Sequence, residues 1–587
     1  MVKQLMKSIR EFKLATILTP TFVVGEVIIE ALIPFLISLL INDIKAGCDL
    51  SVILGYAWKL VILSLLSLLC GYLAGIYCAE ASTGFAKNLR YDIFSNIQKF
   101  SFSNIDKFSS ASLVTRLTTD IQNVQMAFMM IIRTAVRAPL NLIFSFTMAY
   151  IMGGSMAVIF LIIIPFLGIG LYLIVRTVMP VFKKGFPLFD KITRIVEENV
   201  KGIRVVKSFV REDYEIEKFD ETSNDIRKMF TRAEQIIALN NPLMQISIYA
   251  VMLFVLMFGS EMIIKTNGTS LDVGQLSTLM TYGFQIMVSL MMLSMVFVMI
   301  TFSEESSKRI VEVLNEKSSI TSKENAITEV KDGSIDFDHV RFKYSPTAER
   351  PVLENIDVHI KSGETIGIIG GTGSAKSSFV QLIPRLYDVT EGTVRVGKED
   401  VRDYDLVTLR DSVAMVLQKN VLFSGTIADN IRWGNKDATL EEVKHVCHLA
   451  CADEFIEQMP DGYDTWIEQG GTNVSGGQKQ RLCIARALLK QPKILIMDDS
   501  TSAVDTKTDA IIRKAMKEYI PETTKIIIAQ RTSSVEDADR IIVLDGGKID
   551  AIGTSEELLQ TNQIYREVYL SQNKQGTEEI VEEGGVR

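Results

Sequence analysis

The sequence predicts a multi-domain chain, in which an all-α transmembrane domain of six helices is followed by an α/β domain. Long apolar stretches fill residues 12–303, whereas from about residue 334 short β-rich runs alternate with helical ones. Hydrophobic residues make up 48% of the 587 residues, yet 22% are charged. A chain of this length is too long to fold around one hydrophobic core, so two or more domains are expected. The mixed composition indicates an apolar region joined to a water-soluble one.

The apolar region divides into six expected membrane spans, because crossing a bilayer takes about 20 mostly apolar residues. The stretch from 138 to 180 is long enough for two spans, which the tight turn Gly153–Ser155 separates. The expected spans are 14–42, 53–80, 138–153, 156–180, 241–264 and 274–303.

The connections between the spans alternate in length and charge. Segments 81–137 and 181–240 are long and rich in Lys and Arg, so the positive-inside rule places them and both chain ends in the cytoplasm. Their helical periodicity predicts that the membrane helices continue beyond the bilayer. The expected boundaries are 1–303 for the transmembrane domain, 304–330 for a linker, 331–572 for the α/β domain and 573–587 for a flexible acidic tail.

Residues 363–383 predict a strand, a glycine-rich loop and a helix, the context of a phosphate-binding loop. Such a loop points backbone N–H groups at phosphates, Lys376 reaches the terminal phosphates, and the Ser377 hydroxyl holds Mg²⁺. The residues expected to bind ATP here are Gly370, Gly371, Thr372, Gly373, Ser374, Ala375, Lys376, Ser377 and Ser378. The domain is therefore predicted to be an α/β P-loop nucleotide-binding domain.

Two further motifs follow along the chain. The apolar strand 493–499 ends in two carboxylates, and Asp498 is expected to coordinate Mg²⁺. The run NVSGGQKQR (473–481) opens a helix with Ser475, Gly476, Gly477 and Gln478, a second candidate site for an anion.

Together these motifs resemble the ATP-binding-cassette (ABC) exporters in which membrane and nucleotide-binding domains are fused, over nearly all 587 residues. The resemblance implies that Tyr344 stacks on adenine and that Gln418 contacts Mg²⁺ and the attacking water. It also implies an interface loop containing Ser502 and Asp505, and cytoplasmic coupling helices near 112–120 and 206–219. In that family two cassettes sandwich two ATP molecules, and each site combines one cassette's phosphate loop with the other's signature motif.

Three positions depart from the family pattern. Asp499 stands where a Glu polarises the attacking water, Gln530 where a His contacts the γ-phosphate, and Ala375 where a Gly precedes the P-loop lysine. The residues that match the family's signature motif, Ser475, Gly476, Gly477 and Gln478, are intact. This split resembles the degenerate-site subunit of a heterodimeric bacterial multidrug-type exporter, which completes a competent site on a different partner. The alternatives are a working homodimer that tolerates the substitutions and an ATP-gated regulatory or channel-type protein.

The membrane half contains candidate cargo residues. Met287, Met291 and Met295 recur on one face of the last span, where methionines suit varied apolar ligands, although a lipid- or helix-facing stripe is equally compatible. Glu26 and Glu30 lie one turn apart in the first span, where they would attract cationic cargo, lie near headgroups or pair with a partner chain. The expected cargo is hydrophobic or amphipathic (drug-, lipid- or peptide-like), moved across a bacterial plasma membrane. The net charge of −8 argues against a nucleic-acid partner.

Overall fold

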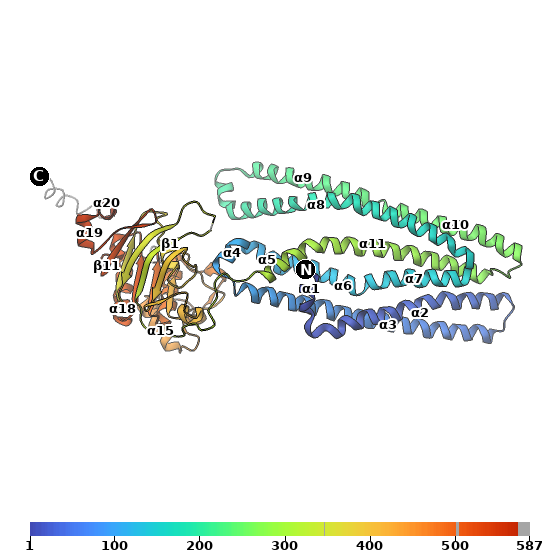
Figure 1. Cartoon of the computed structure of the whole chain (residues 1–587), viewed down its shortest axis with the longest axis horizontal. Helices are drawn as coiled ribbons and strands as arrows, with labels where there is room; N and C mark the ends of the chain where they lie inside the picture. Colours follow the sequence, from blue (N-terminus) through green and yellow to red (C-terminus); the bar gives the residue numbers. More distant parts are fainter. Residues whose placement is uncertain (346, 501–503, 573–587) are drawn as a thin grey trace. The chain divides into compact units, whose positions relative to one another are not determined.

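The structure is a computed structural model that describes residues 1–345, 347–500 and 504–572. It consists of two compact units. The first contains Met1–Lys99 and Ser109–Glu316, and the second contains Phe100–Phe108 together with the chain from Lys317 onward. Figure 1 shows an all-helical first unit and a second unit built from strands and helices. This confirms the predicted fold class.

The first unit is a bundle of long helices whose apolar side chains largely face outward. Five helical stretches among the described residues are long and apolar enough to cross a membrane. One of them, Ser110–Ser208, turns back at Gly154, whose φ of +51° ends α7, so the expected spans 138–153 and 156–180 fall on two helices, α7 and α8. The helices are α1 (Val2–Leu5), η1 (Met6–Phe12), α2 (Lys13–Lys45), α3 (Leu50–Ile97), α5 (Ser110–Thr115), η2 (Arg116–Asp120), α6 (Ile121–Ile132), α7 (Thr134–Gly153), η3 (Gly154–Ala157), α8 (Val158–Ser208), α9 (Glu212–Ile237), α10 (Asn240–Thr266) and α11 (Val273–Asn315).

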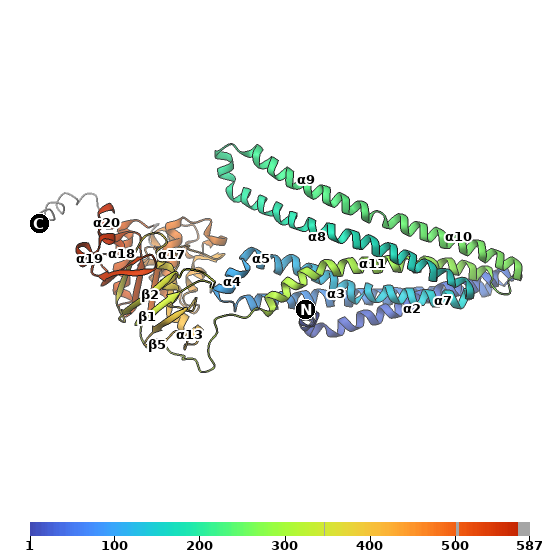
Figure 2. The ribbon, with the colours of Figure 1, turned by 45° about the horizontal axis from the view of Figure 1, so that its top comes forward.

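Several of these helices are much longer than a bilayer requires. α3 has 48 residues and α8 has 51, whereas about 20 suffice to cross the hydrocarbon core. α8 and α9 lie side by side as an antiparallel hairpin in both views (Figures 1 and 2). The helices therefore extend well beyond the expected spans.

One expected boundary changes. Residues 304–315 were expected to belong to the linker, but they continue α11, with Ile310 and Val313 buried. The segment 112–120, expected to be a coupling helix of the transmembrane domain, lies in the first unit, where buried Asp120 accepts hydrogen bonds from Ser306 and Arg309 of α11. The short helix α4 (Phe102–Phe108) groups with the second unit. Segment 206–219, which includes the turn between α8 and α9, also lies in the first unit.

The second unit contains two main sheets. A six-stranded sheet has the order β12-β11-β3-β10-β9-β6, in which β12 alone is antiparallel to its neighbour, and an antiparallel sheet has the order β2-β1-β4-β5. The central strands β9 and β10 are buried along their whole length, as parallel strands covered on both faces are. The strands are β1 (Ile335–Phe342), β2 (Leu353–Ile360), β3 (Thr365–Ile369), β4 (Glu391–Val396), β5 (Glu399–Asp400), β6 (Val413–Val416), β7 (Gly425–Thr426), β8 (Trp466–Ile467), β9 (Ile494–Asp498), β10 (Thr524–Ile528), β11 (Arg540–Asp545) and β12 (Lys548–Gly553).

Helices and short turns surround these sheets. They are α12 (Lys376–Gln381), α13 (Leu406–Asp411), α14 (Ile427–Arg432), α15 (Leu440–Leu449), α16 (Asp453–Ile456), η4 (Gly462–Asp464), η5 (Gln469–Gly471), α17 (Gly476–Leu489), α18 (Thr506–Tyr519), η6 (Thr532–Ser534), α19 (Ser555–Thr561) and α20 (Gln563–Gln572).

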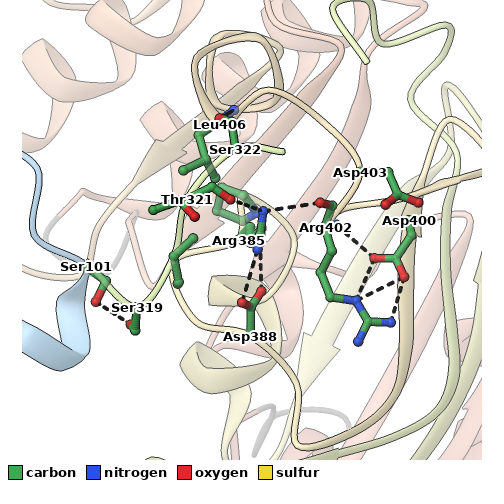
Figure 3. A network of polar contacts seen from close by, with 12 residues as sticks. Ser101, Ser319, Thr321, Ser322, Arg385, Asp388, Asp400, Arg402, Asp403 and Leu406 are labelled. Atoms are coloured by element: carbon green, nitrogen blue, oxygen red, sulfur yellow. Dashed lines mark hydrogen bonds and ion pairs between the residues drawn. The ribbon is translucent and has the colours of Figure 1, made fainter. Parts of the chain in front are cut away.

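Within the second unit, polar contacts connect the segment after α11 to residue Ser101 before α4 and to the loop that carries Arg385 (Figure 3). The hydroxyl oxygens of Ser101 and Ser319 lie 2.8 Å apart. Arg385, which is buried, pairs with Asp388 and donates to the carbonyl oxygen of Thr321 at 3.3 Å. The part of the expected linker after Lys317 therefore runs along the α/β unit.

Candidate nucleotide-binding site

The sheet order brings the ends of four neighbouring strands into one row. The glycine-rich loop follows β3, Gln530 lies just beyond β10, Asp498 ends β9, and Gln418 follows β6. Ligands of open α/β sheets bind beyond the carboxyl ends of the strands. All four segments line one cavity of about 500 Å³, so the structure brings the predicted loop, carboxylates and glutamines together.

The glycine-rich loop leaves open space above its backbone. A Cβ built on Gly371 or Gly373 would meet no atom within 4 Å, and Gly373 has a φ of +83°. The Lys376 Nζ donates to the carbonyl oxygens of Gly370 and Gly371, each at 2.8 Å. Burial lowers the pKa of Lys376, while Asp498 and Asp499 oppose that shift. An open glycine backbone with a lysine held over it fits a bound phosphate chain.

Ala375 occupies a backbone position that favours glycine. Its φ is +71° and its ψ is +22°, in the left-handed region. A residue with a Cβ costs about 1–2 kcal/mol more than glycine there. The structure thus supports strain in the turn as the effect of this departure.

Asp498 and Ser377 form the candidate Mg²⁺ site. Asp498 is 4% exposed, and burial raises the pKa of its carboxyl group, whereas a hydrogen bond from Ser377 lowers it. Carboxylate and hydroxyl oxygens are the ligands that Mg²⁺ prefers. A buried carboxylate beside the P-loop hydroxyl therefore fits a Mg²⁺ ion bound together with ATP phosphates.

Asp499 is held by the two glutamines predicted to lie near it. Its Oδ2 accepts a hydrogen bond from the Gln530 side-chain amide at 2.8 Å and a longer one from that of Gln418 at 3.4 Å. Its backbone N–H donates to the carbonyl oxygen of Ile528, and its φ is +48°. Hydrogen bonds therefore restrain Asp499 through both its backbone and its side chain.

The remaining predicted residues lie on the surface of the same unit. The Tyr344 hydroxyl is 2.8 Å from the Ser378 hydroxyl, and its ring is 46% exposed beside the P-loop. Ser475 caps α17, where its Oγ accepts from the Gln478 N–H and its own N–H donates to the Gln478 side chain. Ser475 and Gly476 are exposed and Gly477 is half-buried. Asp505 caps α18, whereas Ser502 lies outside the described residues.

Sequence reasoning missed Gln480, which is 1% exposed and whose side-chain amide donates to the carbonyl oxygen of Asp499 at 3.4 Å. It ties α17, which carries the signature residues, to the end of β9. Its position five residues after Ser475 was the available signal, but nothing in the spacing shows that the side chain turns inward.

In the membrane unit, the two acidic residues predicted as cargo sites pair within the chain. Arg137 donates to Glu26 at 3.0 Å and to both oxygens of Glu30 at 2.7 and 2.9 Å. Among the predicted methionines, Met287 is fully buried in the bundle core, whereas Met291 and Met295 are exposed.

The chain is similar to known proteins along most of its length. Residues 16–311 match the model for "ABC transporter transmembrane region" and residues 353–502 match that for "ABC transporter". The chain is 34% identical to "Uncharacterized ABC transporter ATP-binding protein YfiB" of Bacillus subtilis, over 94% of this chain and 96% of that protein. It is 31% identical to "ATP-dependent lipid A-core flippase" of Desulfotalea psychrophila, over 85% of this chain and 87% of that protein.

A solved structure has the same fold. "Structure of a bacterial Atm1-family ABC exporter with ATP bound" aligns with a TM-score of 0.83 at 24% identity, over 96% of this chain and 98% of that one.

Proposed function

Because the chain belongs to the ABC transporters, with membrane and ATP-binding regions fused in one ATP-hydrolysing polypeptide, we propose that it is the degenerate-site subunit of a heterodimeric exporter. Its own P-loop site binds Mg·ATP but hydrolyses it poorly. Its signature helix α17 completes a competent site on a different partner subunit.

The observation that carries this proposal is the environment of Asp499. A general base must reach the proton that it abstracts, and misplacement by about 1 Å can cost about 10²-fold in rate. Asp is one methylene shorter than Glu, and its carboxylate already accepts from Gln530 at 2.8 Å. Gln530 is also uncharged, so it stabilises developing negative charge less than a protonated His would.

The signature residues Ser475–Gln478 do not depart from the family pattern. Ser475 and the following glycines begin the 14-residue helix α17, whose N-terminal turn carries a complete capping box and exposed backbone. Donors at the start of a helix of this length favour an anion. The chain therefore offers a partner a complete contact surface for the γ-phosphate while lacking a competent base of its own.

The proposed cargo is a hydrophobic or amphipathic compound exported from the cytoplasm of a bacterial cell. A similar protein is named as a lipid A-core flippase, which fits an amphipathic cargo. The Lys- and Arg-rich connections support a cytoplasmic nucleotide-binding domain.

The test is ATP turnover by the chain alone and with a partner half-exporter that has Glu and His at the positions of Asp499 and Gln530. Alone, the chain should bind Mg·ATP, lose that binding in Lys376→Ala, and turn over little. With the partner, hydrolysis should appear. Cooperative, robust hydrolysis by the chain alone would establish a working homodimer instead.

A further inference from the structure

The acidic pair of the first span is engaged by an arginine of the same chain. Arg137 of α7 bridges Glu26 and Glu30 of α2, and Glu26 is 7% exposed. A Cβ added at Gly71 of α3 would lie 2.9 Å from the Glu26 Oε1, so α3 packs directly against this carboxylate. The three side chains form an internal ion cluster between helices.

Arg133 lies four residues before Arg137 but, unlike Arg137, forms no ion pair with Glu26 or Glu30. Arg133 separates α6 from α7, with φ −111° and ψ −67°, and its side chain is half-buried. Its guanidinium makes no ion pair or hydrogen bond with any residue that the structure describes. A Cβ added at Gly75 would lie 4.0 Å from its Nη1. Because Gly75 falls inside the expected span 53–80, we expect this charge to lie at membrane depth, where an unpaired charge is costly.

Arg133 faces a cavity of about 330 Å³ within the membrane unit. Arg133 and Arg137 are among its lining residues, which include no Asp or Glu. The rest of the wall is almost entirely apolar, and four methionines contribute to it: Met129, Met130, Met292 and Met295. Glu26 and Glu30 pair with Arg137 outside this wall, so the cavity presents positive charge although the four ionised side chains are neutral in sum.

We propose that this cavity binds the anionic headgroup of an amphiphilic cargo molecule, with Arg133 as the specificity-determining residue. A guanidinium binds a carboxylate or a phosphate through two parallel hydrogen bonds. Methionine side chains adapt to apolar chains of different shape. The exporter proposed above therefore carries anionic amphiphiles in preference to cationic ones, and this inference rests on that proposed function because it takes the bound amphiphile to be cargo.

The test is direct binding to the full chain in nanodiscs of phosphatidylcholine alone. The probe is radiolabelled dodecyl phosphate, and dodecyltrimethylammonium is the matched cation. Dodecyl phosphate should bind, the cation should not displace it, and Arg133→Gln should weaken binding roughly tenfold to a hundredfold, because a hydrogen bond to a charged group is lost. The matched control is Arg176→Gln, which removes an exposed arginine of α8 outside the cavity wall and should leave binding unchanged.

Three results would overturn the inference: unchanged affinity in Arg133→Gln, equal competition by the cation, or complete displacement of the probe by added phosphatidylglycerol, which would assign the cavity to bilayer lipid. Arg133→Gln should fold normally because no side-chain partner is lost, and an unchanged melting temperature checks this. Binding is measured without ATP turnover. A working homodimer would therefore refute the degenerate site alone, while binding without transport in proteoliposomes would refute the exporter function alone.

Discussion

The P-loop face and the signature helix of the α/β unit differ in how closely each follows the family pattern. On the P-loop face, Ala375 adopts a left-handed conformation and Asp499 is hydrogen-bonded to Gln530. On the signature helix, Ser475 and Gln478 cap α17 reciprocally. Under the proposed function, the difference teaches that fold and catalytic competence separate, because the P-loop face keeps the sheet, the lysine and the Mg²⁺ carboxylate while its proposed base is restrained.

The largest expected effect is on the signature side. Ser475→Ala should lower ATP turnover of the assembled exporter by about 10²–10³-fold, the cost of losing one donor to developing charge. The measurement is the ATPase rate of the co-expressed complex, normalised to folded protein.

A capping role alone makes a different prediction for Ser475, since losing a cap costs about 1 kcal/mol of stability. Thr554→Ala is the matched control, because Thr554 forms the same kind of capping box at α19. Equal effects of the two variants on melting temperature, with turnover intact in both, would reduce Ser475 to a cap.

The second effect is a gain on the P-loop face. Asp499→Glu combined with Gln530→His should raise ATP hydrolysis by the chain alone by about 10²-fold, because the longer side chain moves the carboxylate by about one bond length, roughly 1.5 Å. The substitution of Gln530 also removes the hydrogen bond that holds position 499. Each single variant serves as a control. If the double variant binds Mg·ATP but its turnover is unchanged, residues 499 and 530 do not limit hydrolysis.

Much of the difference between the P-loop face and the signature helix was predictable from the sequence, because both regions contain short motifs. The loop 370–378 and the run Ser475–Gln478 depend on local spacing, which is visible without a fold. The hydrogen bond between Gln530 and Asp499 depends on β10 pairing with β9, a long-range contact that residue order does not specify.

The membrane half was less predictable for a similar reason. Long apolar stretches predicted the spans, but Arg137 pairs with Glu26 and Glu30 only because α7 packs beside α2. Met287 shares a stripe with Met295 in the sequence, yet the bundle buries one and exposes the other. Helical spacing identifies a face without saying what covers it.

A smaller effect concerns Mg²⁺ and pH on the P-loop face. Burial raises the pKa of Asp498, so its carboxyl group is protonated at a higher pH than an ordinary aspartate with a pKa near about 3.9. Because Mg²⁺ requires the ionised form, Mg²⁺-dependent nucleotide binding should weaken as the pH is lowered from about 7, and at a higher pH than an ordinary aspartate would require. Nucleotide phosphates titrate as well, so the comparison is with Asp498→Asn, which should bind Mg²⁺ weakly and lose the part of the pH dependence due to this group. Identical pH profiles would show that Asp498 does not titrate in this range.

The smallest expected effect is that of Asp499→Asn in the assembled exporter. Asp499 would line the site whose geometry is already poor, and its Oδ2 already accepts from Gln530 at 2.8 Å. Asn keeps an acceptor oxygen of the same reach, so removing the charge should change turnover by less than about twofold, or about 0.4 kcal/mol. The matched comparison is the Glu→Gln change at the corresponding position of the partner, where the same loss of charge should abolish turnover. If Asp499→Asn stops hydrolysis while Ser475→Ala spares it, the weak and strong sites are assigned the wrong way round, and Asp499 is a working base despite its length.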